Sequence, residues 1–398
     1  MNRIILALAL SFACISVAGP IEDTFGVGAR NKALGGAGVS IAEDYTATFY
    51  NPSLLALCRG SRLSLGYDYV HTSLGGGADA AEQLDNYNSI NLGFCLKPLN
   101  QLGIGVYSNF SMGPIEFSAS TLNTNPTYIM YAGDLKAFSM MMGGGYSPFR
   151  QLTVGAAMSM ATGVYLGSEM DVRPGQDPAV IAKFPAQITP IVGAIVGATY
   201  IPMPELHLSL VYRSVTFGKI NIAAKAKGNG TTYADALIEG FLSYSPHQIA
   251  FGSSYLLNDS WLFTGDATYY FWSKYQGPFL QIRTSPTSPS FPDFSIAGVE
   301  NPNFSDVIVL RGGVEYRMLE GLKIRGGYSF RPTPAPAPSR QAKLLDSSTH
   351  RITSGIGYEF QLYQNIFLTA DAFFNVDIMQ DGRGSALNTG LLLGAEYD

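Results

Sequence analysis

Apolar and polar residues alternate with a period of two through most of the chain. In residues 306–319, for example, Ile308 and Leu310 alternate with Arg311 and Glu315. A period of two places alternate side chains on opposite faces of a β-strand, so this segment has one apolar and one charged face. The pattern predicts an all-β protein.

The sequence predicts fourteen strands. They span residues 62–74, 87–99, 101–112, 128–146, 151–168, 183–201, 205–225, 244–258, 260–275, 306–319, 321–332, 350–362, 365–379 and 385–398. Short turns alternate with longer loops rich in Pro, Ser, Asn or Gly. An even number of strands with this alternation is typical of outer-membrane barrels, which must close because lipid cannot hydrogen-bond to an open edge. We therefore expect an antiparallel transmembrane β-barrel over residues 61–398.

Composition argues against other classes. After residue 18 no run of 18 apolar residues occurs, which disfavours a helical membrane protein. The net charge of −5 disfavours a nucleic-acid binder, which needs a surplus of Lys and Arg. A soluble β-sandwich also alternates, but many of the expected strands here exceed the usual five or six residues. A propeller would show a repeat of about 40–50 residues, and we find none.

Residues 1–18 have the features of a signal peptide. A positive start at Met1-Asn2-Arg3 precedes a short apolar core, and small residues near Ala18 suit cleavage. We expect an exported protein that begins near Gly19 and resides in the bacterial outer membrane.

Residues 19–60 lack the alternation and are rich in glycine. Gly35, Gly36 and Gly38 permit close backbone packing. Asn51-Pro52 is typical of a helix start, with Asn as the N-cap and Pro at the first helical position. A tightly packed plug inside a barrel of this size needs such small residues. We therefore expect residues 19–60 to form an N-terminal hatch within the lumen.

Two cysteines follow the signal peptide, Cys58 and Cys95. Export permits a disulfide, but two cysteines are no framework for a chain of this length. The sequence favours two independent buried thiols. The alternative, a bridge, would join the hatch to the barrel wall.

Three groups of residues resemble the outer-membrane long-chain fatty-acid and hydrocarbon transporters of the FadL type. Gly35 to Asp44, followed by Asn51-Pro52, is similar to the hatch of that family. Trp261 and Trp272-Ser273, which we place on one strand, are similar to its mid-barrel signature. Arg325-Gly326-Gly327-Tyr328 is a third match. The chain ends on Asp398 where the family usually has an aromatic residue, so its completeness at the C-terminus stays open.

The resemblance implies a function as well as a fold. Such proteins capture a hydrophobic ligand among the outer loops and pass it to a lumenal site beside the hatch. They then release it sideways into the membrane through a kinked third strand. We expect a fatty acid as the ligand, a monomer surrounded by outer-membrane lipid and lipopolysaccharide, and no cofactor, metal or nucleic acid. Relatives also carry aromatic hydrocarbons, and the sequence does not separate these substrates.

Three sets of candidate site residues follow. Two outer loops carry apolar residues at helical spacing and are expected to form the capture groove, unless these faces only pack against each other: Val180, Ile181 and Phe184, and Leu237, Ile238 and Phe241. Candidates for binding a carboxylate, unless they only pair with acids inside the barrel, are Arg213, Arg311 and Arg325. Candidates for the kink, unless the strand simply ends there, are Asn109, Gly113 and Pro114.

An enzyme is the alternative from another class, since some outer-membrane barrels are lipases or proteases. The four histidines lie in no HExxH motif, and no GxSxG motif occurs. We expect no catalytic residues. An adhesin or receptor would explain the loops but not the hatch.

Overall fold

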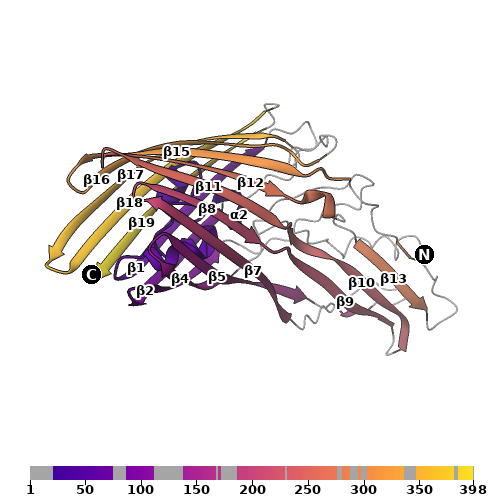
Figure 1. Ribbon diagram of the computed structural model, residues 1–398. Helices are drawn as coiled ribbons and strands as arrows, with labels where there is room; N and C mark the ends of the chain where they lie inside the picture. The colour runs from indigo at the N-terminus through magenta and orange to yellow at the C-terminus, as the bar shows by residue number, and fades with distance from the viewer. Residues whose placement is uncertain are drawn as a thin grey trace.

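The chain forms a closed barrel of fourteen antiparallel strands (Figure 1), which confirms the predicted fold class. The computed structural model describes residues 21–74, 87–111, 138–166, 169–171, 186–228, 231–275, 280–286, 295–296, 303–335, 347–380 and 384–397. The barrel strands are β1 (Ser61–Leu74), β2 (Tyr87–Leu99), β3 (Leu102–Ser111), β4 (Phe138–Phe149), β5 (Leu152–Leu166), β7 (Ala186–Met203), β8 (Leu206–Arg213), β11 (Gln248–Leu257), β12 (Trp261–Tyr270), β15 (Val307–Leu319), β16 (Leu322–Arg331), β17 (Thr349–Tyr363), β18 (Ile366–Met379) and β19 (Gly384–Tyr397). Pairing of β1 with β19 closes the cylinder.

The alternation in the sequence separates the outer wall from the lumen. On β15, Ile308 and Leu310 are 50% and 53% exposed, whereas Glu315 is 1% exposed. The same holds on β18, where Phe374 is exposed and Asp377 is buried. An apolar outer face and a polar interior are typical of a transmembrane barrel, whose outer surface contacts lipid.

The N-terminal segment forms short helices that lie in the lumen of the barrel. They are α2 (Ile21–Phe25), α3 (Ala29–Ala33), α4 (Ala47–Tyr50) and the 3-10 helix η1 (Pro52–Leu57). η1 contacts β3, β4, β5 and β7, whereas α3 contacts β16 to β19 on a different part of the wall. The N-terminal segment therefore crosses the interior, as the indigo ribbon in Figure 1 shows. None of the helices in the described ranges has the length and apolar character to cross a bilayer.

Five further strands form a second sheet beyond the loop end of the barrel, which is the end with the longer connections between strands (Figure 1). The opposite end, with the short connections, is the short-turn end. The order of the second sheet is β14 (Ser295–Ile296), β13 (Leu280–Pro286), β10 (Thr231–Ser245), β9 (Thr216–Gly228) and β6 (Glu169–Asp171). This sheet corrects two expectations. The strand expected at 205–225 divides at residues 214–215 into β8 and β9. The helical turn expected around Leu237 is a strand, because β10 finds hydrogen-bonding partners in β9 and β13.

Two other expectations concern strand ends. β12 ends at Tyr270, so Trp272 and Ser273 do not continue the strand but lie in the 3-10 turn η2 (Trp272–Lys274). The turn is closed by the N–H of Tyr275, which donates to the carbonyl of Trp272 over 2.9 Å. The expected residues 128–137 of the fourth strand lie outside the described residues.

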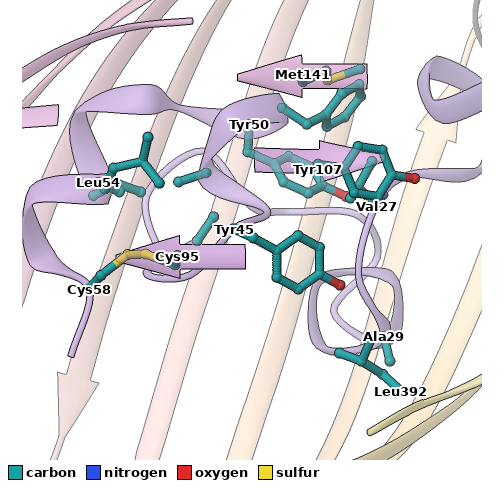
Figure 2. Close-up of a cluster of buried hydrophobic side chains, with 14 of the residues drawn as sticks. Val27, Ala29, Tyr45, Tyr50, Leu54, Cys58, Cys95, Tyr107, Met141 and Leu392 are labelled. Carbon is teal, nitrogen blue, oxygen red and sulfur yellow. A yellow bond between two sulfur atoms is a disulfide. The ribbon is translucent and has the colours of Figure 1, made fainter. Parts of the chain in front are cut away.

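Cys58 and Cys95 form a disulfide, so the preference for two independent thiols is wrong. Cys58 directly follows η1 and Cys95 lies on β2, so the bond joins the N-terminal segment to the wall. Figure 2 shows the bond beside the buried rings of Tyr45 and Tyr107. The folded interior brings the sulfur atoms together across 37 residues of sequence, a proximity that spacing alone does not reveal.

Candidate functional site

Asn51 fixes the C-terminal part of the N-terminal segment. Its Oδ1 accepts hydrogen bonds from the N–H and hydroxyl of Ser53, which caps η1 as the Asn-Pro pair predicts. Its Nδ2 donates to the carbonyl of Val39 and to Thr199 on β7, each over 2.9 Å. One fully buried amide therefore joins two stretches of the segment to the wall.

Glycines in the wall allow the segment to approach the strands. A Cβ at Gly145 on β4 would lie 2.6 Å from the carbonyl oxygen of Pro52, and one at Gly155 on β5 would lie 2.3 Å from the carbonyl carbon of Pro52. Real Cβ atoms do not approach backbone so closely. The contact therefore depends on glycine at these wall positions.

Glycines in the segment meet the wall or the segment itself. Gly35 has φ +72°, and a Cβ there would lie 2.7 Å from the carbonyl oxygens of Gly312 and Tyr328. Gly36 has φ +81°, which favours glycine, and a Cβ at Gly38 would meet the ring of Tyr50 at 2.6 Å. The structure thus brings the glycine-rich run against β15 and β16.

Arg325 belongs to an ion-pair cluster on the short-turn side of the segment. Its guanidinium donates to Glu315 over 2.7 Å and to Asp371 over 2.5 Å. Arg30 of the segment also pairs with Glu315, over 2.9 Å. Because two carboxylates already satisfy Arg325, its contacts favour the structural alternative over ligand binding.

A cavity of about 1190 Å³, including its open mouth, lies on the loop side of the segment. The segment supplies its floor, with Val39, Phe49 and Tyr50. Apolar residues of the surrounding wall are Val211, Tyr244, Ala250, Tyr270, Trp272, Val307 and Val309. A concave, mostly apolar site with a few polar groups is typical of a small-molecule pocket.

Arg213 and Arg311 both line this cavity, but their partners differ. Arg213 pairs with Asp23 of the segment, donates to the carbonyl of Phe49, and lies 4.1 Å from the Phe49 ring centroid. Among the described residues, Arg311 donates to hydroxyl groups, those of Thr268 over 2.8 Å and Tyr270 over 3.0 Å.

The charge of Arg311 is therefore incompletely matched. Within the described part of the chain, its guanidinium has no carboxylate within 4.0 Å. Its cross-strand neighbour Asp266 instead accepts a hydrogen bond from the N–H of Val39. Of the three candidate arginines, Arg311 can therefore bind an acidic ligand without giving up an existing salt bridge among the described residues.

Sequence reasoning missed several cavity residues. Arg351 lines the cavity and pairs with Asp377, and its alternation with the exposed Ile352 on β17 was the available signal. Glu22 and Asp23 of α2 also line it, and no sequence pattern marks them. Burial raises the pKa of the Glu22 carboxyl, although hydrogen bonds from Ser139 and Asn109 oppose that shift.

Other candidates are placed differently. Asn109 lies on β3 in a continuous ladder, opposite Asn91 of β2 and Ser139 of β4. Leu237, Ile238 and Phe241 lie on β10 in the second sheet. The remaining candidates lie outside the described residues: Val180, Ile181, Phe184, Gly113 and Pro114.

Comparisons with known proteins agree with this architecture. Alkane uptake protein A of Marinobacter nauticus is 21% identical over 391 residues, which cover 88% of this chain and 83% of that protein. The crystal structure of the Pseudomonas putida toluene transporter TodX has a TM-score of 0.62 at 17% identity, covering 94% of this chain and 99% of its own. A Pseudomonas aeruginosa FadL homologue gives 0.54 at 13% identity, covering 91% and 96%. At these identities the solved structures show a shared fold.

The family model described as outer membrane protein transport protein (OMPP1/FadL/TodX) matches residues 13–397. This match spans the described N-terminal segment and all fourteen barrel strands. The chain belongs to this family of outer-membrane transport proteins.

Proposed function

We propose that the protein takes up hydrophobic compounds with an anionic head group, foremost long-chain fatty acids. The observation that carries this proposal is Arg311, a cation without a salt bridge in the described residues, inside a mostly apolar cavity. A planar guanidinium binds a carboxylate through paired hydrogen bonds, which are stronger than those between neutral groups.

The cavity offers separate places for the two parts of such a ligand. The carboxylate lies at Arg311, near the hydroxyls of Thr268 and Tyr270. The hydrocarbon chain lies against Val307, Val309 and the other apolar lining residues. Removal of the chain from water supplies about 0.8 kcal/mol per buried CH₂.

Residues 19–60 act in this proposal as the hatch. The described part of this segment separates the apolar cavity from a second, charged cavity on the short-turn side, which Arg30, Glu43 and Asp44 line. The outer loops capture the ligand, and movement of the segment releases it sideways through the wall. The protein acts as a monomer among outer-membrane lipid and lipopolysaccharide, without a cofactor.

Uptake of uncharged hydrocarbons is the second candidate. It is favoured by the aromatic rings of Tyr244 and Trp272 in the cavity and by relatives named for alkane uptake and toluene transport. In this alternative the ligand makes no use of Arg311. The two candidate functions therefore differ in whether the ligand binds to Arg311.

Binding of oleate and of 1-octadecene, which has the same chain length but no carboxylate, tests the choice. Arg311→Gln should weaken oleate binding by about 10- to 150-fold, the range for hydrogen bonds to charged groups, and leave 1-octadecene unaffected. The control is Arg317→Gln, which removes the same charge from an exposed residue at the short-turn end. Equal effects of Arg311→Gln on both ligands would contradict a carboxylate site, and tighter binding of 1-octadecene would support the hydrocarbon alternative.

A further inference from the structure

The 3-10 turn η2 lies at the loop end of the cavity, directly after β12. Trp272, its first residue, is 7% exposed and lines the cavity. Tyr244 of β10 also lines the cavity, and its ring centroid lies 5.9 Å from that of Trp272. η2 therefore presents an aromatic surface to whatever occupies the cavity.

More aromatic rings support Trp272 from behind. Its ring centroid lies 5.8 Å from the centroids of both Tyr275 and Phe304, in edge-to-face geometry. Phe304 is 4% exposed, and neither it nor Tyr275 lines the cavity. Trp272 is thus held by aromatic contacts, which favour a defined orientation of its ring.

Asp306 connects η2 to the barrel rim. It directly precedes β15, and its carboxylate accepts hydrogen bonds from the N–H of Ser273 over 2.7 Å and from the hydroxyl of Tyr269 over 2.8 Å. Burial opposes ionisation, but these two donors and the charge of Lys274 hold the pKa of Asp306 below its ordinary value. Asp306 is therefore an anion at neutral pH, and anionic acceptors form the stronger class of hydrogen bond.

Backbone hydrogen bonds also hold the turn. Lys274 donates its N–H to the carbonyl of Phe271, which closes the turn on itself. Among the described residues, the bond from Ser273 to Asp306 is the backbone contact that reaches from η2 to another strand of the barrel. Phe271, which directly precedes η2, donates its N–H to the carbonyl of His247 over 3.1 Å and anchors the start of the turn. Within η2 itself, the contact to the barrel rim thus runs through one carboxylate.

We propose that η2 is a gate between the outer loops and the cavity, in which Trp272 covers the cavity and Asp306 is the latch. The proposal rests on the proposed function in that the cavity receives the ligand. Asp306 is a positioning residue, because it touches η2 rather than the ligand. Release of Ser273 lets η2 swing outward and opens the cavity to the loops, and rebinding covers the ligand again.

A gate has a kinetic signature that distinguishes it from a simple structural role. A weaker latch increases the open population, so the ligand enters and leaves faster. The affinity of the closed cavity is unchanged, because Asp306 does not contact the ligand. Loss of structure would instead lower the affinity.

The experiment uses Trp272 as its own reporter. The chain has two tryptophans, so Trp261→Phe leaves Trp272 as the single one. In this background we compare Asp306→Asn with Asp259→Asn, which makes the same charge change in the exposed turn between β11 and β12. Asn suits that turn, since Asp259 has φ 54°. Iodide quenching of Trp272 and the association and dissociation rates of oleate are measured on the purified full chain.

Asp306→Asn should increase the open population, and with it both oleate rates, by about tenfold, the effect of weakening one hydrogen bond to a charged group. Iodide should quench Trp272 more strongly, the dissociation constant should stay constant, and Asp259→Asn should match the parent. Tyr269→Phe, which removes one of the two donors, should fall between them. Unchanged quenching in a folded Asp306→Asn barrel would overturn the latch. If oleate does not bind, the proposed function fails, whereas the quenching arm still decides the latch.

Discussion

Asn51→Ala should release the N-terminal segment from the wall. The Asn51 side chain is fully buried and makes four hydrogen bonds, two to Ser53, one to Val39 and one to Thr199. Alanine removes all four and leaves the carbonyl of Val39 and the N–H of Ser53 without these partners. The substitution therefore affects both the cap of η1 and the tie to β7.

The magnitude follows from these lost contacts. Loss of an N-cap costs about 0.5–2 kcal/mol, and a buried group left without a partner costs about 1–3 kcal/mol. Allowing for overlap between the two terms, we expect about 2–4 kcal/mol less stability for the attached segment. Every 1.4 kcal/mol is tenfold, so the detached population rises about 30- to 700-fold.

Hydrogen exchange of the protein in lipid bilayers measures this change. Residues 39–57 should lose protection in Asn51→Ala, while the barrel strands keep theirs. The control is Pro52→Ala, since the Pro52 ring makes no hydrogen bond, and loss of its rigidity costs about 1 kcal/mol or less. Wild-type protection of residues 39–57 in a folded Asn51→Ala barrel would show that Asn51 does not hold the segment to the wall.

Three further predictions concern the same segment. Gly145→Ala should displace η1 and raise protease sensitivity of the segment, whereas Gly144→Ala, whose Cβ would have its nearest contact at 3.6 Å, should not; equal sensitivity of both variants would count against the close approach. Cys58 and Cys95 should resist alkylation until they are reduced, and free thiols in the unreduced protein would exclude the disulfide. Replacing both cysteines with Ser should lower the free energy of unfolding by about 3–4 kcal/mol for a loop of this length. Burial raises the pKa of Glu22 above 4.5, so the stability of α2 should be greatest below pH 4.5 and should fall as the pH rises through the raised pKa. Hydrogen exchange of residues 21–26 should show this pH dependence, and Glu22→Gln should abolish the pH dependence.

The alternation in the sequence predicts the barrel because it reports a property of single strands. Ile308 and Leu310 face outward and Glu315 faces inward, as a period of two requires. Lys323 and Glu359 face inward on neighbouring strands and pair over 2.9 Å, as expected for charges inside the barrel. Period and charge together therefore assign the lumenal face before any partner strand is known.

Features that depend on contacts between distant parts of the chain were missed, because the sequence of a single strand does not reveal its partners. Alternation continues across residues 205–225, but the change of partner strand at Ser214 leaves no mark on the period. The apolar residues around Leu237 suit a helix or a strand equally, and pairing with β9 and β13 decides between them. Arg325 and Arg311 look alike in sequence. Their difference arises in the packed interior, where Arg325 contacts two carboxylates and Arg311 has none within salt-bridge distance among the described residues.

A crystal structure of the protein with oleate would locate both the carboxylate and the hydrocarbon chain of the ligand. We expect ligand density in the loop-side cavity, with the carboxylate within hydrogen-bond distance of the Arg311 guanidinium and the chain along Val307, Val309 and Trp272. Oleate bound elsewhere, or lying in this cavity with its carboxylate turned away from Arg311, would contradict this expectation.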